Sequence, residues 1–365
     1  TPSDADVTSL WQAAYKGINN INFLVQSIDK PGTAVTPALL SYKGEALYFR
    51  ALIYYNLVTR YGGVPIILKN STDAVQRSTE AQVWSQIKSD LQTSRSVIGA
   101  YSNNLYVSDQ AVKALMARVY LATGDNANAL TYADSLINYS NKKFALSTDS
   151  MSYSSMFIAG SPGKEIIFAL ANNSTANSHS FSGQVNDTKA TWPYSPSAFT
   201  FQNLYLNSSS PVIKNGDKRK AAVFTSDITR VIKFPNGKSN QQLAASTNPL
   251  ATPIIISRLA EMYLIKAEAQ GALTGSATLA PYFANRYNAP PATATVAALS
   301  AHQFQDLILN ERRREFFAEG HWWYDIKRTG RTDLLTTLNG RNYLLYYPIP
   351  QTEKDLAGYT QNPGY

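Results

Sequence analysis

The sequence contains no cysteine, so disulfide frameworks, thiolate nucleophiles and cysteine-bound zinc are all excluded. Histidine is scarce too: His179, His302 and His321 are too far apart in the sequence to indicate a metal cluster. No apolar run reaches the roughly 18 residues that a membrane-spanning helix needs. The glycine-rich dinucleotide motif and the Gly-x-Ser-x-Gly elbow of serine hydrolases are also missing. We therefore expect neither a bound metal nor a cofactor.

Charge is sparse as well. Charged residues make up 16% of the 365 residues, below the usual share of about 25%, while 44% are hydrophobic and supply a full core. The net charge of +8 is too small to indicate nucleic acid without a clustered basic stripe. Basic residues do concentrate between 211 and 240. This stretch either attracts an anionic sugar, a lipid headgroup or an acidic partner, or is an ordinary solvated loop.

Residues 1–140 predict amphipathic helices arranged in pairs. Apolar side chains recur three and four residues apart, which is the period of a helix with one buried face. The pattern covers residues 10–28, 46–58, 79–91 and 111–137, and it returns at 254–269. Within 111–137, small alanines flank the turn at Gly124, as is typical of the tetratricopeptide repeat. We therefore expect helical repeats that form a scaffold and present a binding surface.

The middle of the chain has a different composition. Between residues 141 and 250, Asn, Ser, Thr, Gly and Pro dominate, interrupted only by short β-like pieces such as 166–170 and 231–234. Irregular segments of this length are uncommon in compact domains and tend to carry function. The sequence predicts one all-α domain of tetratricopeptide-like repeats with a loop-rich insertion that contains short β pieces. Its expected parts are N-terminal helical repeats over 1–140, a loop-rich ligand-site region over 141–250, and a C-terminal helical repeat and terminal block over 251–365.

Aromatic side chains stand in the least regular part of this middle region. Sugars expose apolar C–H faces that stack on aromatic rings, while their hydroxyl groups need amide and carboxylate partners. A loop that offers both favours a carbohydrate site, and the alternative is that the loop packs on its own rings. The candidate ligand contacts are Trp192, Tyr194, Phe199, Asn203 and Tyr205. The aromatic run Trp322-Trp323-Tyr324 is instead expected in the core.

The densest run of charge lies between residues 310 and 328. Glu311, Glu315 and Glu319 are four residues apart, so they share one face of a helix. One hypothesis makes two of these carboxylates, or Asp325, the acid/base pair of a glycoside hydrolase. The other makes them a structural network of ion pairs with the neighbouring arginines. Arginines lower the pKa of a nearby carboxyl group, the wrong direction for a general acid, so the sequence favours the network.

Separated motifs follow one another in a fixed order over nearly the whole chain. They are Leu47–Ala51 with Tyr61-Gly62-Gly63-Val64-Pro65, Ala114–Asp125, Lys164–Phe168, Arg258–Leu264 with Ala267-Glu268-Ala269, Glu311–Phe316 with Glu319-Gly320 and Asp325–Arg328, and finally Pro348-Ile349-Pro350 with Gln361–Tyr365. Each motif alone is weak evidence. Together they resemble the SusD/RagB family of Bacteroidetes outer-membrane proteins.

The resemblance implies an all-helical fold and a surface-exposed lipoprotein that binds a nutrient glycan without cleaving it. It implies a SusC-like TonB-dependent outer-membrane transporter as partner, and a lipidated cysteine upstream of Thr1 as the membrane anchor. The family motifs are scaffold, so the resemblance assigns no ligand contact in this chain. One branch of the family binds peptides, so a peptide-binding repeat protein stays open beside the glycan binder and the hydrolase.

Overall fold

The computed structural model describes residues 1–71, 73–139, 143–158, 163–171, 197, 204–205, 216–226, 231–234 and 252–365. The chain forms two compact units, each assembled from separate parts of the sequence. Unit 1 comprises Thr1–Tyr101, Val107–Thr123 and Trp323–Tyr365. Unit 2 comprises Ser102–Tyr106 and Gly124–Trp322.

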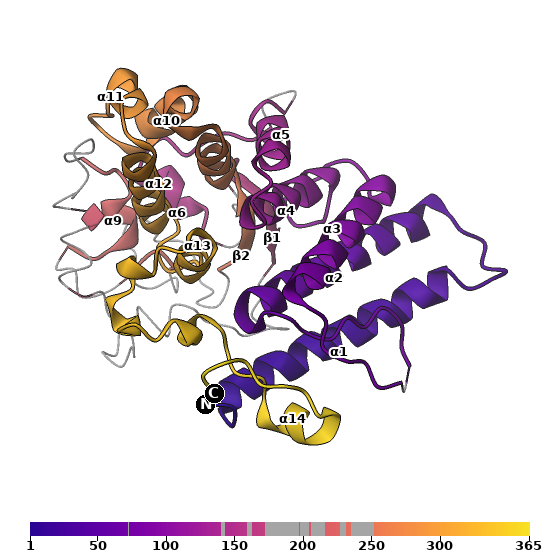
Figure 1. Cartoon of the computed structure of the whole chain (residues 1–365). Helices are drawn as coiled ribbons and strands as arrows, with labels where there is room; N and C mark the ends of the chain where they lie inside the picture. Colours follow the sequence, from indigo (N-terminus) through magenta and orange to yellow (C-terminus); the bar gives the residue numbers. More distant parts are fainter. Residues whose placement is uncertain are drawn as a thin grey trace. The chain divides into compact units, whose positions relative to one another are not determined.

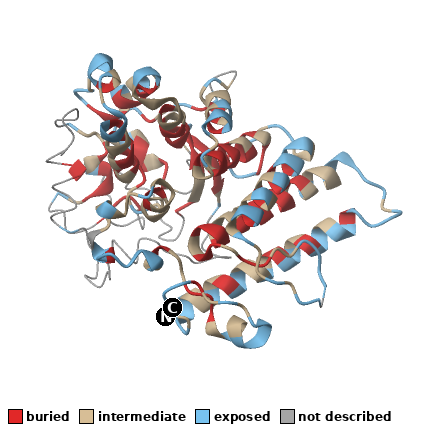
Figure 2. Ribbon diagram, in the orientation of Figure 1, coloured by how far each residue is buried: buried red, intermediate tan, exposed pale blue. Residues whose placement is uncertain are grey.

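Unit 1 is built on four helices, and its C-terminal part adds shorter elements. The four are α1 (Ala5–Ile28), α2 (Pro37–Tyr61), α3 (Glu80–Val97) and α4 (Asp109–Ala122), followed late in the chain by α13 (Trp322–Thr329), three single 3-10 turns (Thr332–Leu334, Thr336–Leu338 and Asn342–Leu345) and α14 (Gln351–Ala357) (Figure 1). α2 packs against both α1 and α3, and α3 packs against α4. α2 is buried along much of its length, whereas α1 is mainly exposed or intermediate (Figure 2).

Local side-chain signals determine where these helices begin. Asp4, Thr36 and Ser108 each accept a hydrogen bond from a backbone N–H of the first turn that follows. Thr79 does the same for α3 and, with Gln82, completes a reciprocal capping box. Each cap satisfies a donor that a helix N-terminus otherwise leaves unpaired. The helices predicted at 10–28, 46–58 and 79–91 are therefore confirmed, and each is longer than its apolar pattern.

Arg50 links three helices from inside unit 1. It is 6% exposed and holds the Asp90 carboxylate of α3 through two hydrogen bonds, Nε to Oδ2 at 2.8 Å and Nη2 to Oδ1 at 2.6 Å. A third bond runs from Arg50 Nη1 to Asn22 Oδ1 of α1 at 2.8 Å. Because the charge is paired and its donors are used, a buried arginine is tolerated within the apolar stretch of α2.

The turn after α2 requires glycine at two successive positions, for two different reasons. Gly62 has a φ of 73°, in the left-handed region that residues with a Cβ rarely adopt. Gly63 is constrained by space instead, because a Cβ there would lie 2.3 Å from the carbonyl oxygen of Ser78. The chain leaves this turn through Val64 and forms an isolated antiparallel bridge between Pro65 and Arg77.

Unit 2 joins a small sheet to a second set of helices. Its elements are α5 (Asn126–Ile137), α6 (Ser150–Ser155), β1 (Ile166–Leu170), α9 (Lys220–Val223), β2 (Ile254–Arg258), α10 (Leu259–Arg286), α11 (Thr293–Ala297) and α12 (Ala301–Glu315) (Figure 1). β1 pairs antiparallel with β2, so that Ile166 lies opposite Arg258 and Leu170 opposite Ile254. α10 packs against α5, α11 and α12, and α6 packs against α9.

The prediction of a helix over 254–269 is wrong at its start. Residues Ile254–Arg258 form strand β2, and the helix begins at Leu259. Three consecutive isoleucines favour a strand because β-branched side chains suit its pleated surface, but a short apolar run fits both periods. The strand predicted at 166–170 and the Gly124 turn, with its φ of 75°, are confirmed. The mainly helical fold with short β pieces is also confirmed.

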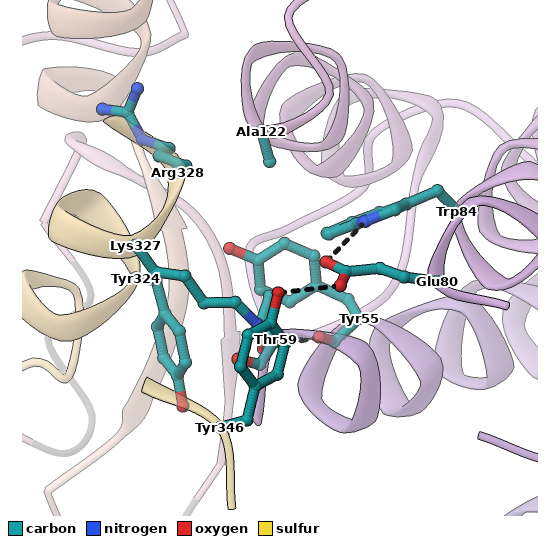
Figure 3. A pocket seen from close by; sticks show the side chains of 9 residues that line it. All are labelled: Tyr55, Thr59, Glu80, Trp84, Ala122, Tyr324, Lys327, Arg328 and Tyr346. Carbon is teal, nitrogen blue, oxygen red and sulfur yellow. Dashed lines mark hydrogen bonds between the residues drawn. The ribbon is translucent and has the colours of Figure 1, made fainter. Parts of the chain in front are cut away.

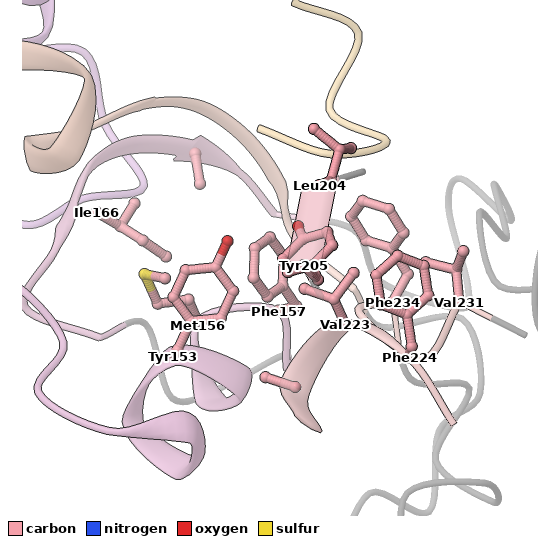
Figure 4. Packing of buried hydrophobic residues seen from close by; sticks show 12 residues of the cluster. Tyr153, Met156, Phe157, Ile166, Leu204, Tyr205, Val223, Phe224, Val231 and Phe234 are labelled. Atoms are coloured by element: carbon pink, nitrogen blue, oxygen red, sulfur yellow. The ribbon is translucent and has the colours of Figure 1, made fainter. Parts of the chain in front are cut away.

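A hydrophobic cluster in unit 2 fixes the described pieces of the middle region in place (Figure 4). It contains Tyr153, Met156, Phe157, Ile166, Ala169, Leu204, Tyr205, Ala222, Val223, Phe224, Val231 and Phe234. The rings of Tyr205 and Phe224 meet edge to face, with centroids 5.2 Å apart. Those of Phe157 and Phe234 meet in the same way at 5.5 Å. Such pairs add stability beyond the burial of apolar area, so several short segments share one core.

Candidate functional site

The most heavily charged side chains of the C-terminal part meet inside unit 2 around Glu315. This residue is the last of α12 and is 0% exposed. It accepts hydrogen bonds from Arg286 Nε at 2.8 Å, from Arg219 Nη1 at 2.6 Å and from Arg258 Nη1. Tyr282 also donates its hydroxyl proton to Glu315 Oε2 at 2.8 Å. One carboxylate therefore receives donors from elements that are far apart in the sequence.

Glu311 and Glu319 are held in the same manner. Glu311 Oε1 lies 2.7 Å from Arg219 Nη1. Glu319 Oε1 lies 2.8 Å from Arg258 Nη2 and 2.5 Å from Lys233 Nζ. The side chain of Glu311 is 0% exposed and that of Glu319 is 8% exposed. The prediction that all three carboxylates share a helix face is wrong for Glu319, because α12 ends at Glu315 and Glu319 lies in the turn that follows. Each of the three nevertheless pairs with buried basic side chains.

The arginines keep these carboxyl groups ionised. Burial raises the pKa of Glu315, but the charges of Arg286 and Arg258 outweigh it and hold the pKa well below its ordinary value. The pKa values of Glu311 and Glu319 are also lowered, again because neighbouring cations outweigh burial. A carboxyl group that stays ionised has no proton to give to the leaving group of a glycosidic bond.

Asp325 completes the set proposed for the hydrolase. It lies in unit 1, is 3% exposed, and its Oδ1 is 2.9 Å from Arg328 Nη2. All four candidate carboxylates are thus buried and paired with basic side chains. The hydrolase hypothesis is wrong, and the structural network that the sequence favours is confirmed.

Two basic residues of the stretch 211–240 belong to this network. Arg219 and Lys233 are each 1% exposed. Besides Glu319, the Lys233 ammonium donates to the backbone oxygens of Glu315 and Phe317, both at 3.0 Å. Burial lowers the pKa of Lys233 to about 8, against the raising effect of Glu319. Both predictions for this stretch, a solvated loop and a site for an anionic ligand, are therefore wrong for Arg219 and Lys233, whose charges are buried and paired within the protein. Lys214, Arg230 and Lys238 of the same stretch lie outside the described residues.

The structure places one of the five candidate ligand contacts. Tyr205 is 6% exposed, lies in the hydrophobic cluster of unit 2 (Figure 4), and donates its hydroxyl proton to the carbonyl oxygen of Arg314 at 2.8 Å. This position favours the packing alternative for Tyr205. Trp192, Tyr194, Phe199 and Asn203 lie outside the described residues and stay predictions.

Unit 1 contains a cavity that the sequence did not indicate (Figure 3). Its volume is about 140 Å³, and it is lined by Tyr55, Thr59, Glu80, Trp84, Ala122, Tyr324, Lys327, Arg328 and Tyr346. We call it the aromatic hollow. Its rings come from α2, α3, α13 and the segment after the last 3-10 turn. The rings of Tyr55 and Trp84 meet edge to face, with centroids 5.8 Å apart.

Glu80 and Lys327 are two charged lining residues that contact aromatic side chains of the hollow. Glu80 accepts from the Tyr346 hydroxyl at 3.0 Å and, more weakly, from Trp84 Nε1 at 3.4 Å, so both side chains point toward it (Figure 3). Lys327 Nζ donates to the Thr59 carbonyl oxygen at 3.0 Å and lies 3.6 Å from the centroid of the Tyr346 ring. Burial lowers the pKa of Lys327 to about 8, and Glu80 opposes this shift. At neutral pH Lys327 is therefore mainly a cation.

A second cavity adjoins the hollow. It measures about 450 Å³ and shares Glu80 and Tyr346 with the first. Its remaining lining residues are Gly62, Gly63, Asn342, Tyr343, Asn362 and Pro363. Gly62 and Gly63, the two glycines of the turn after α2, therefore form one part of its wall. Asn362 and Pro363, near the C-terminus, form another part. Together the two cavities offer rings, a carboxylate, an ammonium and an amide.

Sequence reasoning missed this site because its members are far apart in the chain. Trp323 and Tyr324 were expected in the core, but both are only half-buried. Trp323 Nε1 reaches the Leu345 carbonyl oxygen at 3.3 Å, and Tyr324 lines the hollow. Trp322 is also half-buried, and the guanidinium carbon of Arg313 lies over its ring, 4.7 Å from the centroid. In the sequence, polar residues surround these aromatics, whereas aromatics of a core follow a hydrophobic stripe. This difference is the signal that could have separated them from core residues.

Within the described part of the chain, no group of three or more His, Asp or Glu side chains is arranged to hold a metal ion. Searched over the same residues, no helix combines the length and the apolar character that crossing a bilayer demands.

Comparison with known proteins gives consistent matches. Residues 1–121 match a family model described as starch-binding and associating with the outer membrane, and residues 176–365 match the model of the SusD family. SusD-like protein P38 of Formosa agariphila is 25% identical over 93% of this chain and 76% of its own length.

Solved structures share the fold. A SusD superfamily protein from Bacteroides thetaiotaomicron is 25% identical, with a TM-score of 0.75 over 97% of this chain and 85% of the other. A laminarin-binding SusD-like protein is 22% identical, with a TM-score of 0.76 over 98% of this chain and 86% of the other. With more than half of its residues covered by the family model, the chain belongs to the SusD family of non-catalytic, outer-membrane-associated glycan-binding proteins of Bacteroidetes.

Proposed function

We propose that this protein captures a nutrient oligo- or polysaccharide at the cell surface and delivers it, uncleaved, to a partner SusC-like TonB-dependent outer-membrane transporter. The match of residues 176–365 to the SusD family model carries this proposal. The buried and paired carboxylates around Glu315 support it, because they provide no acid for bond cleavage. A lipid anchor upstream of Thr1 would hold the protein at the outer membrane.

Ring stacking is the proposed means of capture. Trp192, Tyr194 and Phe199 would stack on the C–H faces of sugar rings, and the Asn203 amide would bind a hydroxyl group. Delivery requires release, so affinity in the micromolar range serves this role better than very tight binding. A laminarin-binding protein shares the fold, which makes this neutral glucan a sensible first ligand to test.

The described residues that follow this segment are anchored at the end of α12. Tyr205 donates a hydrogen bond to the backbone oxygen of Arg314, and Lys233 donates one to that of Glu315, both in the last turn of α12. Arg219 joins them through Glu315. Three points of the middle region are thus tied to one helix end.

Affinity electrophoresis of the variant Trp192→Ala tests the capture step. We expect the wild-type protein to be retarded in gels that contain a neutral glycan such as laminarin, and the variant to lose most of this retardation. Trp192→Phe keeps a ring for stacking and should retain it. Equal retardation of all three proteins would mean that residue 192 does not contact the glycan.

A peptide pull-down beside a glycan array tests the ligand class. Retention of glycans and not of peptides is expected, and the reverse would favour the peptide-binding alternative. Delivery is tested separately by purification of the full-length protein from outer membranes in mild detergent. Recovery of a TonB-dependent transporter in the same complex is expected, and repeated recovery of the protein alone would argue against the partnership.

A further inference from the structure

The aromatic hollow of unit 1 combines aromatic rings with a few polar groups. Four of its lining side chains are aromatic, namely Tyr55, Trp84, Tyr324 and Tyr346. Flat rings of this kind stack on the C–H faces of pyranose sugars. A purely hydrophobic pocket would not place a carboxylate and an ammonium among the rings. This combination resembles an ordinary small-molecule site, in which few polar groups orient a mostly apolar contact.

The polar groups of the hollow retain capacity for a ligand. The Glu80 carboxylate has about four lone-pair sites, and within the described structure it accepts from Tyr346 and from Trp84. The Lys327 ammonium has three protons. One is donated to the Thr59 carbonyl oxygen, and the ammonium also makes a cation–π contact with the Tyr346 ring. An acceptor and a donor are thus available to bind the hydroxyl groups of a sugar.

The charged side chains that line the hollow are offset by opposite charges. Glu80 opposes Lys327, and the charge of Arg328 is paired with Asp325, with Nη2 and Oδ1 2.9 Å apart. Two further cations face the rings: the Arg60 guanidinium lies 5.0 Å from the centroid of the Tyr324 ring, and that of Arg118 lies 5.9 Å from the centroid of the Tyr55 ring. A cationic ligand is therefore disfavoured, and burial of an uncompensated ionic group would cost free energy. A neutral, hydroxyl-rich ligand fits this balance.

The volumes limit how much of such a ligand enters. The hollow, at about 140 Å³, has the space of about five water molecules at about 30 Å³ each, which suits a single sugar ring. The adjoining cavity, at about 450 Å³, holds more and shares Glu80 and Tyr346 with the hollow. Tyr343, 36% exposed, supplies that cavity with a further ring. An end residue in the hollow would continue into the larger cavity.

We propose that the aromatic hollow binds the terminal residue of a neutral oligosaccharide, with the following residues in the adjoining cavity. This is a second sugar site, formed entirely by unit 1, whereas segment 192–205 belongs to unit 2. The inference rests on the proposed glycan-binding function and adds a location and a ligand class to it.

The test uses the indole N–H signal of Trp84 in two-dimensional NMR of the full chain labelled with ¹⁵N. Trisaccharides of glucose, mannose and galactose are titrated into the Trp192→Ala variant, so that the loop site does not contribute. We expect at least one trisaccharide to shift the Trp84 signal in a saturable way. Tyr346→Ala should abolish the shift, and Lys327→Met should weaken affinity by about tenfold, which corresponds to the loss of one hydrogen bond of about 1.4 kcal/mol.

Matched controls separate ligand contact from damage to the fold. Tyr42 is 55% exposed on α2 and does not line the hollow, so Tyr42→Ala should leave the titration unchanged. Lys327→Met removes the ammonium but keeps an unbranched side chain only one atom shorter, so it tests the site if Tyr346→Ala unfolds. If the wild-type protein binds glycans while the Trp84 signal never moves, the hollow is not a sugar site and the proposed function stands. If no glycan binds the wild-type protein at all, both proposals fall.

Discussion

Arg286 holds Glu315 through two parallel hydrogen bonds, from Nε to Oε2 at 2.8 Å and from Nη2 to Oε1 at 3.0 Å. Both residues are buried, and the same guanidinium also donates to Glu165. Planar pairing of this kind fixes the orientation of both side chains. The contact explains why a chain with a dense run of acidic residues has no general acid among them. The carboxylates serve the assembly of unit 2, and ligand binding is left to other residues.

Glu315→Gln should destabilise unit 2 strongly. The amide removes the charge that balances Arg219, Arg258 and Arg286, and an uncompensated buried cation costs about 3–5 kcal/mol. Urea unfolding measures the loss, and the exposed Asp355→Asn serves as control and should change stability by less than about 0.5 kcal/mol. An unchanged midpoint for Glu315→Gln would show that the buried pairs do not hold the unit together.

Gly63 after α2 and Gly124 after α4 should respond differently to alanine. Gly124→Ala places a Cβ in open space at a φ of 75°, so only backbone strain of about 1 kcal/mol is expected. Gly63→Ala meets the Ser78 oxygen at 2.3 Å and should cost more, because α3 begins two residues later and the backbone must move. Thermal melting of both variants checks the order, and a smaller loss at Gly63 would contradict the packing of this turn.

Part of the fold follows from sequence alone, and the reasons are local. Capping residues such as Thr79 and the glycine at 124 act on their own neighbours, so helix starts and turns can be read in order along the chain. The partners of Glu315 come from positions as distant as Arg219, and chain order does not indicate that they meet. The helix-face spacing of Glu311 and Glu315 predicted a charged network, but not its burial.

The candidate sites illustrate the same limit. Composition marked residues 192–205 because their aromatics stand among polar residues in a stretch without periodicity. The aromatic hollow gives no such signal, since Tyr55, Trp84 and Tyr346 each lie in an ordinary segment and converge only in the folded unit. Tyr205 shows the converse, because an aromatic residue in a polar segment packs into a core when other short segments supply rings to meet it.

Tyr205→Phe should lower stability and leave glycan affinity unchanged. The change removes one hydrogen bond to the Arg314 carbonyl oxygen and keeps the ring against Phe224, so a loss of about 1 kcal/mol is expected. Chemical denaturation and affinity electrophoresis in laminarin, run on the same samples, separate the two effects. Weakened glycan binding without any change in stability would restore Tyr205 as a ligand contact.

The stability contributed by Lys327 should depend on pH. Its pKa is about 8 in the folded protein, below the ordinary value of 10.5, so between these values the unfolded chain holds more protons than the folded one. The free energy of unfolding of the wild-type protein, relative to Lys327→Met, therefore rises from about pH 8 toward pH 10.5, by at most about 1 kcal/mol per pH unit. Below about pH 7 the difference should be flat, because the folded and the unfolded chain then both hold the proton.

Urea denaturation of the wild-type protein and of Lys327→Met at pH 7, 8 and 9 measures this dependence. The comparison with the variant removes the contribution of other titrating groups, including Tyr346, whose pKa is raised to about 12 by burial and by Glu80. A difference that falls as pH rises from 8 to 9 would mean that the ammonium is stabilised, rather than disfavoured, by the hollow.

Isothermal titration of the wild-type protein with neutral oligosaccharides, followed by chromatography of the recovered sugar, tests the central claim most directly. Binding without cleavage predicts saturable heat for at least one oligosaccharide and recovery of that sugar at its original length. Shorter products, or the absence of saturable heat across the whole panel of glycans, would contradict it.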